Sequence, residues 1–88
     1  MELRHLRYFA AVAETCHFGR AADQLLVAQP ALSYATPQRA AELGVTLFNR
    51  TTRQVSLTAA GEFLKAEVAR ILTGVEDAER GVRRIAAG

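Results

Sequence analysis

The first third of the chain carries two short series of apolar positions at helical spacing. Residues 2–15 present one apolar face with charged positions off it, and residues 18–26 present a second such face. Cys16 and His17 separate the two series, so we predict two helices with a short break between them. The predicted inward positions are Leu3, Leu6, Phe9, Ala10, Val12 and Ala13 in the first helix and Phe18, Ala21, Ala22 and Leu25 in the second.

A connector of two residues, 27–28, leads to a predicted third helix that begins near Gln29 and Pro30. So short a connector suits only an angled pair of helices. Proline is tolerated in the first helical turn, where its missing N–H had no intrahelical partner. Ala28 lacks the side-chain oxygen of a usual cap. Gly44 predicts the end of this helix, because glycine readily adopts the left-handed conformation.

Residues 45–58 have the pattern of a β-hairpin. A short apolar run, Val45, Leu47 and Phe48, precedes the polar and basic segment 49–53. Residues 54–58 then alternate polar and apolar, as a half-buried strand does. We therefore predict a wing with a charged tip.

The last third of the chain carries a heptad stripe. Thr58 is the predicted cap of a long helix that begins at Ala59. Apolar residues then recur at steps of four and three, the spacing of a helix that lies along another helix. A homodimer through this stripe is the expected arrangement, and its residues are Leu64, Val68, Ile71, Val75, Ala78, Val82 and Ile85.

An alternative is that the stripe packs on the helix's own head. Leu64 and Val68 are close enough to the head to do so. Ala78, Val82 and Ile85 lie too far along, at about 1.5 Å per residue, to reach a head of this size. These three residues therefore need a partner chain or a domain outside these 88 residues to cover them. Whether that partner runs parallel or antiparallel does not follow from the spacing.

Length and composition fit one small domain, with a head at residues 1–58 and a dimerisation helix at 59–88. Half of the 88 residues are hydrophobic, but no run is long enough to cross a membrane. The N-terminal residues MELRHLRYF carry charges where a signal peptide needs an apolar run, which favours a cytoplasmic protein.

Charge and chemistry narrow the function further. The formal net charge of +2 permits a nucleic-acid partner without requiring one. Cys16 is the single cysteine, no Cys/His set has metal-ligand spacing, and we expect no cofactor. His5 and His17 are isolated, and no carboxylate pair, activated nucleophile or phosphate-binding glycine loop is evident, so an enzyme is disfavoured.

Helix, helix, tight turn, helix and hairpin together make a mainly α-helical, winged helix-turn-helix fold. Five blocks in register, MELRHLRYF, HFGRAADQL, AQPALS, ELGVTLFNRTTR and VSLTAAGE, resemble the DNA-binding domain of LysR-type transcriptional regulators. The resemblance covers essentially the whole chain. It implies a DNA-binding head, a linker helix that pairs antiparallel with its mate, and a pseudo-palindromic promoter site. It also implies a small-molecule effector, bound by a further domain.

The resemblance places candidate DNA-binding residues on this sequence. Gln29, Pro30 and Ser33 match the start of the recognition helix, where an amide can pair with adenine and a hydroxyl can reach phosphate. The alternative for Gln29 and Ser33 is a solvated helix surface. On the wing, Arg53 matches a minor-groove or phosphate contact. Two further candidates are Arg50 on the wing, which could instead pair with Glu42, and Arg20, which could hold a phosphate.

The segment from Tyr34 to Ala41 departs from the family pattern, which often reads SRQIRQLEAELG. Tyr34 stands where the family often has an arginine. The guanidinium that could bind guanine through two hydrogen bonds is therefore replaced by a phenol ring that could contact a thymine methyl group. Arg39 falls on a position of the predicted third helix that faces the core. Pro37 lies where the helix interior is expected, at a cost of about 3 kcal/mol. A continuous helix kinked at Thr36 is favoured over two helices at residues 29–35 and 37–43.

Two functions of different kinds follow. The first is the DNA-binding and dimerisation part of a sequence-specific transcription regulator. The second is a dimeric interaction module whose head has lost sequence-specific DNA binding because of the atypical segment 34–41.

Overall fold

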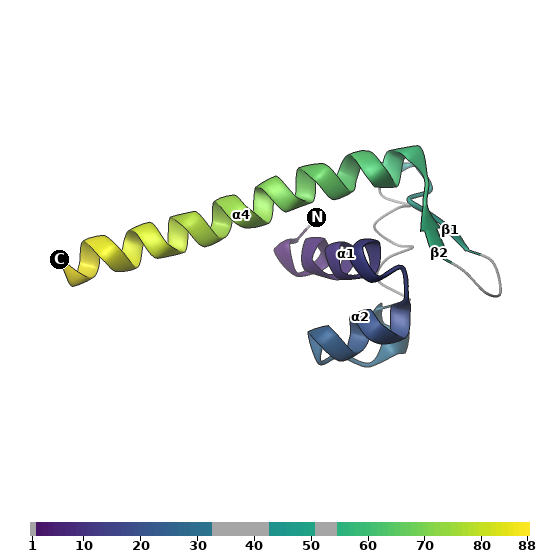
Figure 1. Cartoon of the computed structure of the whole chain (residues 1–88), viewed down its shortest axis with the longest axis horizontal. Helices are drawn as coiled ribbons and strands as arrows, with labels where there is room; N and C mark the ends of the chain where they lie inside the picture. The colour runs from purple at the N-terminus through teal and green to yellow at the C-terminus, as the bar shows by residue number, and fades with distance from the viewer. Residues whose placement is uncertain (1, 33–42, 51–54) are drawn as a thin grey trace.

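The computed structural model describes residues 2–32, 43–50 and 55–88 (Figure 1). The described residues are mostly helical, and a two-stranded sheet in the head directly precedes a long final helix in the sequence. The elements are α1 (Leu3–Thr15), α2 (Phe18–Leu25), β1 (Phe48–Arg50), β2 (Val55–Leu57) and α4 (Ala59–Ala87).

The predicted break between the first two helices is confirmed. Cys16 adopts the left-handed conformation, with φ 52°, and its N–H donates to the Val12 carbonyl at 2.7 Å. His17 is extended and caps α2, because its Nδ1 accepts the Arg20 N–H at 3.0 Å. The predicted second helix is one residue too long, since Leu26 is the left-handed C-cap of α2, with φ 58°.

The predicted start of the third helix is confirmed within the described residues. The Ala31 and Leu32 N–H groups donate to the Ala28 carbonyl at 3.1 and 3.3 Å, and residues 29–32 are helical. Gly44, with φ 71°, ends a helical turn as predicted. The choice between a kinked and a split helix at Pro37 lies outside the described residues.

The predicted wing is a short antiparallel hairpin. Phe48 pairs with Leu57, and Arg50 pairs with Val55. The strands are shorter than the apolar pattern predicts: Val45 lies outside β1 and is 45% exposed. The hairpin places its second strand directly before the cap of α4 (Figure 1).

Thr58 joins the wing to α4. Its Oγ1 accepts the Gly61 N–H at 3.0 Å, which confirms the predicted cap, and donates to the Thr46 carbonyl at 2.6 Å. Its own N–H donates to the Leu47 carbonyl at 3.0 Å. A Cβ at Gly61 would lie only 2.2 Å from that Leu47 carbonyl oxygen. The absence of a side chain at Gly61 therefore lets α4 pack directly on the backbone that leads into β1.

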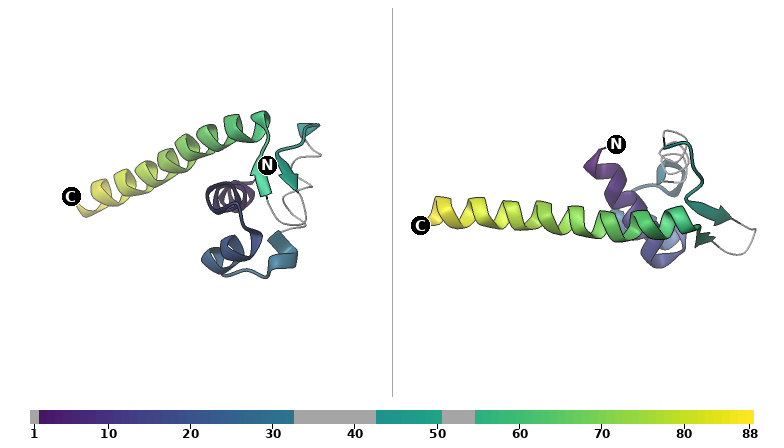
Figure 2. Two further views of the ribbon diagram at one scale, coloured as in Figure 1. Left: turned by 45° about the vertical axis from the view of Figure 1, so that its right-hand side comes forward. Right: turned by 90° about the horizontal axis from the view of Figure 1, so that it is seen from above.

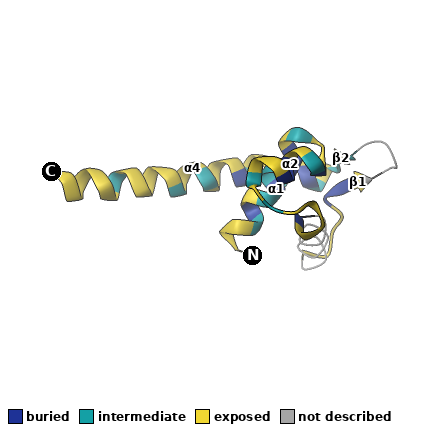
Figure 3. Ribbon diagram, turned by 90° about the horizontal axis from the view of Figure 1, so that it is seen from below, coloured by how far each residue is buried: buried dark blue, intermediate teal, exposed yellow. Residues whose placement is uncertain are grey.

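The core lies where α1, α2, β1 and the first half of α4 meet (Figure 3). The Phe48 ring of the wing packs against Phe9 of α1 and Phe18 of α2, with centroid distances of 5.4 and 6.1 Å. Each fully buried side chain of this size contributes about 1.5–3 kcal/mol. The buried core residues are Leu6, Phe9, Val12, Ala13, Phe18, Ala21, Ala22, Leu32, Leu47, Phe48 and Val68.

The C-terminal half of α4 extends well beyond the head, as both views in Figure 2 show. The principal extents of 53 × 25 × 19 Å follow from this projection. Among the described residues, no helix combines the length and apolar character needed to cross a membrane.

Candidate nucleic-acid interface

The surface predicted to read DNA begins directly after α2. Leu32 is completely buried, whereas Gln29 and Pro30 on the same helical turn are exposed. Leu32 thus fixes the turn against the core, and this fixes which side of the turn faces solvent. The structure therefore leaves the two predicted site residues Gln29 and Pro30 open to a partner.

The start of α2 lies next to this surface. Arg20 is exposed in the first turn of α2, and none of the carboxylates described pairs with it. A guanidinium free in this way can bind a phosphate oxygen. The structure also brings His17 close to Gln29, since both side chains contact the space above Gly19. Nothing in the sequence alone indicates that His17 lies beside Gln29.

Three of the predicted DNA-binding residues, Ser33, Tyr34 and Arg53, lie outside the described residues. The backbone of Arg50 forms the end of β1, opposite Val55, but its side chain is not described. Glu42, its alternative ion-pair partner, is also outside the described residues. The wing contacts therefore stay predictions.

The heptad stripe divides between two surfaces of α4. Val68 is completely buried in the head, and Leu64 is half-buried and packs against the same core. The assignment of Val68 to the dimer contact was wrong, because no surface of its side chain is left for a partner. The alternative that these two residues pack on the head is confirmed. Leu72, which the heptad omits, joins them there, and the spacing 64, 68, 72 is the signal that could have found it.

The rest of the stripe runs out along the projecting half of α4. Val75 is half-buried, and Ala78 is exposed. Ile71, Val82 and Ile85 are 44%, 67% and 81% exposed. In Figure 3 this half of the helix is almost wholly exposed. A branched apolar side chain left in water at each of several positions predicts a partner surface.

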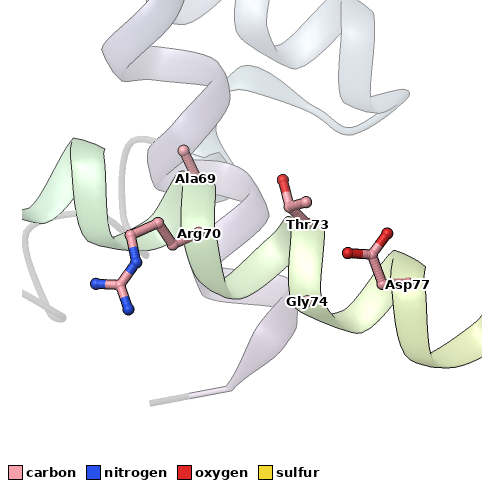
Figure 4. Close-up of a pocket in the computed structure, with 5 residues that line it drawn as sticks. All are labelled: Ala69, Arg70, Thr73, Gly74 and Asp77. Carbon is pink, nitrogen blue, oxygen red and sulfur yellow. The ribbon is translucent and has the colours of Figure 1, made fainter.

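Charged side chains on α4 form local pairs. Arg70 binds Glu67 at 2.9 Å, and Arg80 binds Asp77, each one turn apart and largely exposed. A shallow hollow lies over Gly74, with Arg70 and Asp77 lying apart on either side of it (Figure 4). Its lining comes from one helix alone, so it is an indentation of the helix surface. Within residues 2–32, 43–50 and 55–88 no three His, Cys, Asp or Glu side chains gather as a metal site.

Sequence comparison identifies relatives over the whole head. Residues 3–62 match the family described as bacterial regulatory helix-turn-helix protein, lysR family. The chain is 48% identical over 88 residues to YnfL, an uncharacterized HTH-type transcriptional regulator of Escherichia coli (strain K12), covering 100% of this chain and 30% of YnfL. It is 51% identical over 87 residues to the HTH-type transcriptional regulator AlsR of Bacillus subtilis (strain 168), covering 94% of this chain and 29% of AlsR. The chain thus spans about a third or less of the length of these two relatives.

Solved structures of related domains have the same fold. The protein in the BenM_DBD/catB site 1 DNA complex superposes with a TM-score of 0.96 at 43% identity, covering 100% of this chain and 98% of that one. The protein in the CbnR_DBD-DNA complex superposes with a TM-score of 0.91 at 38% identity, covering 98% of this chain and 99% of that one. The chain, with its winged helix-turn-helix head and long final helix, belongs to the lysR family of bacterial regulatory helix-turn-helix proteins.

Proposed function

We propose that this chain is the DNA-binding and dimerisation part of a sequence-specific transcription regulator. The observation that carries the proposal is the exposure of Gln29 and Pro30 on a helical turn that buried Leu32 anchors directly after α2. This is how a helix-turn-helix presents the start of its recognition helix to the major groove. Membership of a regulator family and the likeness to proteins solved on DNA support it.

The proposed contacts divide into base reading and positioning. Gln29 is the reader of an adenine edge, with Pro30 beside it at the start of the helix. The basic residues of α2 and the wing hold phosphates or the minor groove and set the register of the head on the duplex. The proposed site residues are Gln29, Pro30, Ser33 and Tyr34 at the recognition helix, Arg50 and Arg53 on the wing, and Arg20 on α2.

A second copy of the chain is the proposed partner of α4. The contact uses the exposed part of the stripe, from Ile71 through Val75, Ala78 and Val82 to Ile85. Two heads joined in this way would match a pseudo-palindromic site, because half-sites on DNA mirror the two-fold axis of the protein.

The remaining assignments follow from the proposed function. A regulator of bacterial genes works where the chromosome lies, so the cytoplasm is the proposed location. Transcriptional regulation needs no catalysis, and we propose no enzymatic activity or cofactor for the chain. A small-molecule effector would act through a domain other than these 88 residues.

The test is selection of bound duplexes from a random DNA library at about 150 mM salt, where non-specific binding is weak. The expected result is enrichment of a motif with two-fold symmetry. Sedimentation of the same sample establishes whether the protein is a dimer. A dimer that enriches no motif would contradict the proposal and favour the second function, an interaction module that has lost specificity.

A further inference from the structure

Three residues that are separated in the sequence meet at the start of α2. His17 is the N-cap, Gly19 is in the first turn, and Gln29 opens the helical turn that follows the connector. A Cβ built on Gly19 would lie 2.9 Å from Cε1 and 3.3 Å from Nδ1 of His17, and 3.5 Å from Oε1 of Gln29. The imidazole and the amide therefore contact the same small space above the bare backbone of Gly19.

The His17 ring is held in place at this point. Its Nδ1 accepts the Arg20 N–H at 3.0 Å, which restricts the rotamer of the exposed ring. The backbone N–H of His17 donates to Thr15 Oγ1 at 3.2 Å, so the residue is also fixed at its main chain. A nitrogen that accepts a hydrogen bond carries no proton, so the neutral ring has its proton on Nε2. The imidazole of His17 therefore has a restricted position beside the Gln29 side chain.

Gln29 is exposed and has three side-chain torsions to order before its amide can read a base edge. The conformational entropy that this side chain loses in the complex opposes binding. An imidazole that restricts the side chain before binding reduces that entropy cost. Oε1 of Gln29 lies over Gly19 in this structure, and the imidazole beside it limits the space in which the amide can reorient. The effect of the imidazole therefore falls on the base pair that Gln29 reads.

We propose that His17 is a positioning residue for Gln29, and that Gly19 is the opening that brings the two side chains together. His17 then contributes to sequence preference without contacting DNA itself. The inference rests on the proposed function, because it has meaning only if Gln29 reads a base. It adds the N-cap of α2 to the residues that determine specificity.

The critical variant is His17→Ser. Serine is among the most favoured N-cap residues, so its Oγ can accept the Arg20 N–H and retain the cap, while the ring beside Gln29 is lost. We expect unfolding to remain close to that of the wild-type protein. We expect the ratio of affinities for the correct and the altered base to fall by about threefold to tenfold at one base pair of the selected site. This is a part of the discrimination that one amide–adenine pair provides.

Two further variants identify that base pair and provide the control. Gln29→Ala should lose preference at the same base pair as His17→Ser, and the double variant should lose no more than Gln29→Ala alone. Gln24→Ala, at an exposed position of α2, should leave the preference at every base pair unchanged.

The experiment measures the relative affinity of the full chain for the selected site and for its single-base variants. A drop for His17→Ser confined to the Gln29 base pair supports the inference. A His17→Ser protein that keeps the wild-type preference shows that His17 is a helix cap alone and overturns it. A loss spread evenly over all base pairs also overturns it. A wild-type protein that selects no site overturns the proposed function and this inference together, which distinguishes that failure from the others.

Discussion

Gly61→Ala tests the contact between α4 and the wing. The new methyl carbon would lie 2.2 Å from the Leu47 carbonyl oxygen and 2.9 Å from Cδ2 of Leu57. The side-chain atom can move aside, but the carbonyl oxygen accepts the Thr58 N–H at 3.0 Å and is part of the backbone entering β1. Either α4 moves away from the head or this hydrogen bond is distorted.

The magnitude follows from two opposing effects. Alanine in place of glycine favours the helix by up to about 1 kcal/mol. Overpacking costs about 1–3 kcal/mol of stability. The cost should be at or above the top of that range here, because the new methyl group meets a backbone carbonyl that cannot move aside. The expected net loss is about 2 kcal/mol in the free energy of unfolding. For a chain of this size that corresponds to a fall of about 8–16 °C in melting temperature.

The assay is thermal unfolding followed by circular dichroism at one fixed protein concentration, because self-association shifts the apparent melting temperature. Gly81→Ala is the matched control, since it lies in the same helix and a Cβ there meets nothing within 4 Å. It should be neutral or slightly stabilising. A Gly61→Ala protein as stable as the Gly81→Ala protein would refute the close packing of α4 on Leu47.

Three matched pairs of substitutions test the left-handed cap of α2, the two surfaces of α4 and the wing. Leu26→Gly should stabilise the head by about 0.5–1 kcal/mol in urea unfolding, because Leu26 is 92% exposed and has a strained left-handed backbone that glycine adopts freely. Leu25→Gly should instead destabilise the head, and equal losses for the two variants would contradict the strain at Leu26. Val68→Ala should lower the free energy of unfolding by about 2 kcal/mol, whereas Val82→Ala should change it by no more than about 0.5 kcal/mol. Val82→Ala should instead weaken the dimer in sedimentation, and an unchanged dimer would remove Val82 from the contact. Arg53→Ala should lower the salt dependence of DNA binding by about 1 for each bound chain, unlike Arg83→Ala at the far end of α4; an unchanged slope would remove Arg53 from the interface.

Local signals in the sequence predicted most of the head. Thr58 and Gly44 marked helix ends because capping and the left-handed conformation depend on residue type within one turn. The hairpin was found because strand alternation is equally local. The error at Leu26 has the same origin, since an apolar residue at helical spacing gives no sign that it ends the helix.

Features that depend on tertiary contacts were predicted only in part, since the packing of Leu64 and Val68 on the head was the alternative and not the favoured prediction. The heptad rule placed Val68 in the dimer stripe, whereas the head covers that side of α4 and uses the spacing 64, 68, 72 instead. Nothing local shows that Gly61 faces the Leu47 carbonyl. At the candidate site the exposure of Gln29 was predicted, but the approach of His17 to Gln29 across Gly19 depends on the angle between two helices.

Paired heads of this chain are proposed to bind duplex DNA in a sequence-specific way. The most direct measurement is titration of the protein, at about 150 mM salt, into a duplex carrying the selected site and into a shuffled duplex of the same length and composition. We expect two chains bound per selected duplex and a preference over the shuffled duplex of about a thousandfold or more. Equal affinity for the two duplexes, with the dimer intact, would contradict it.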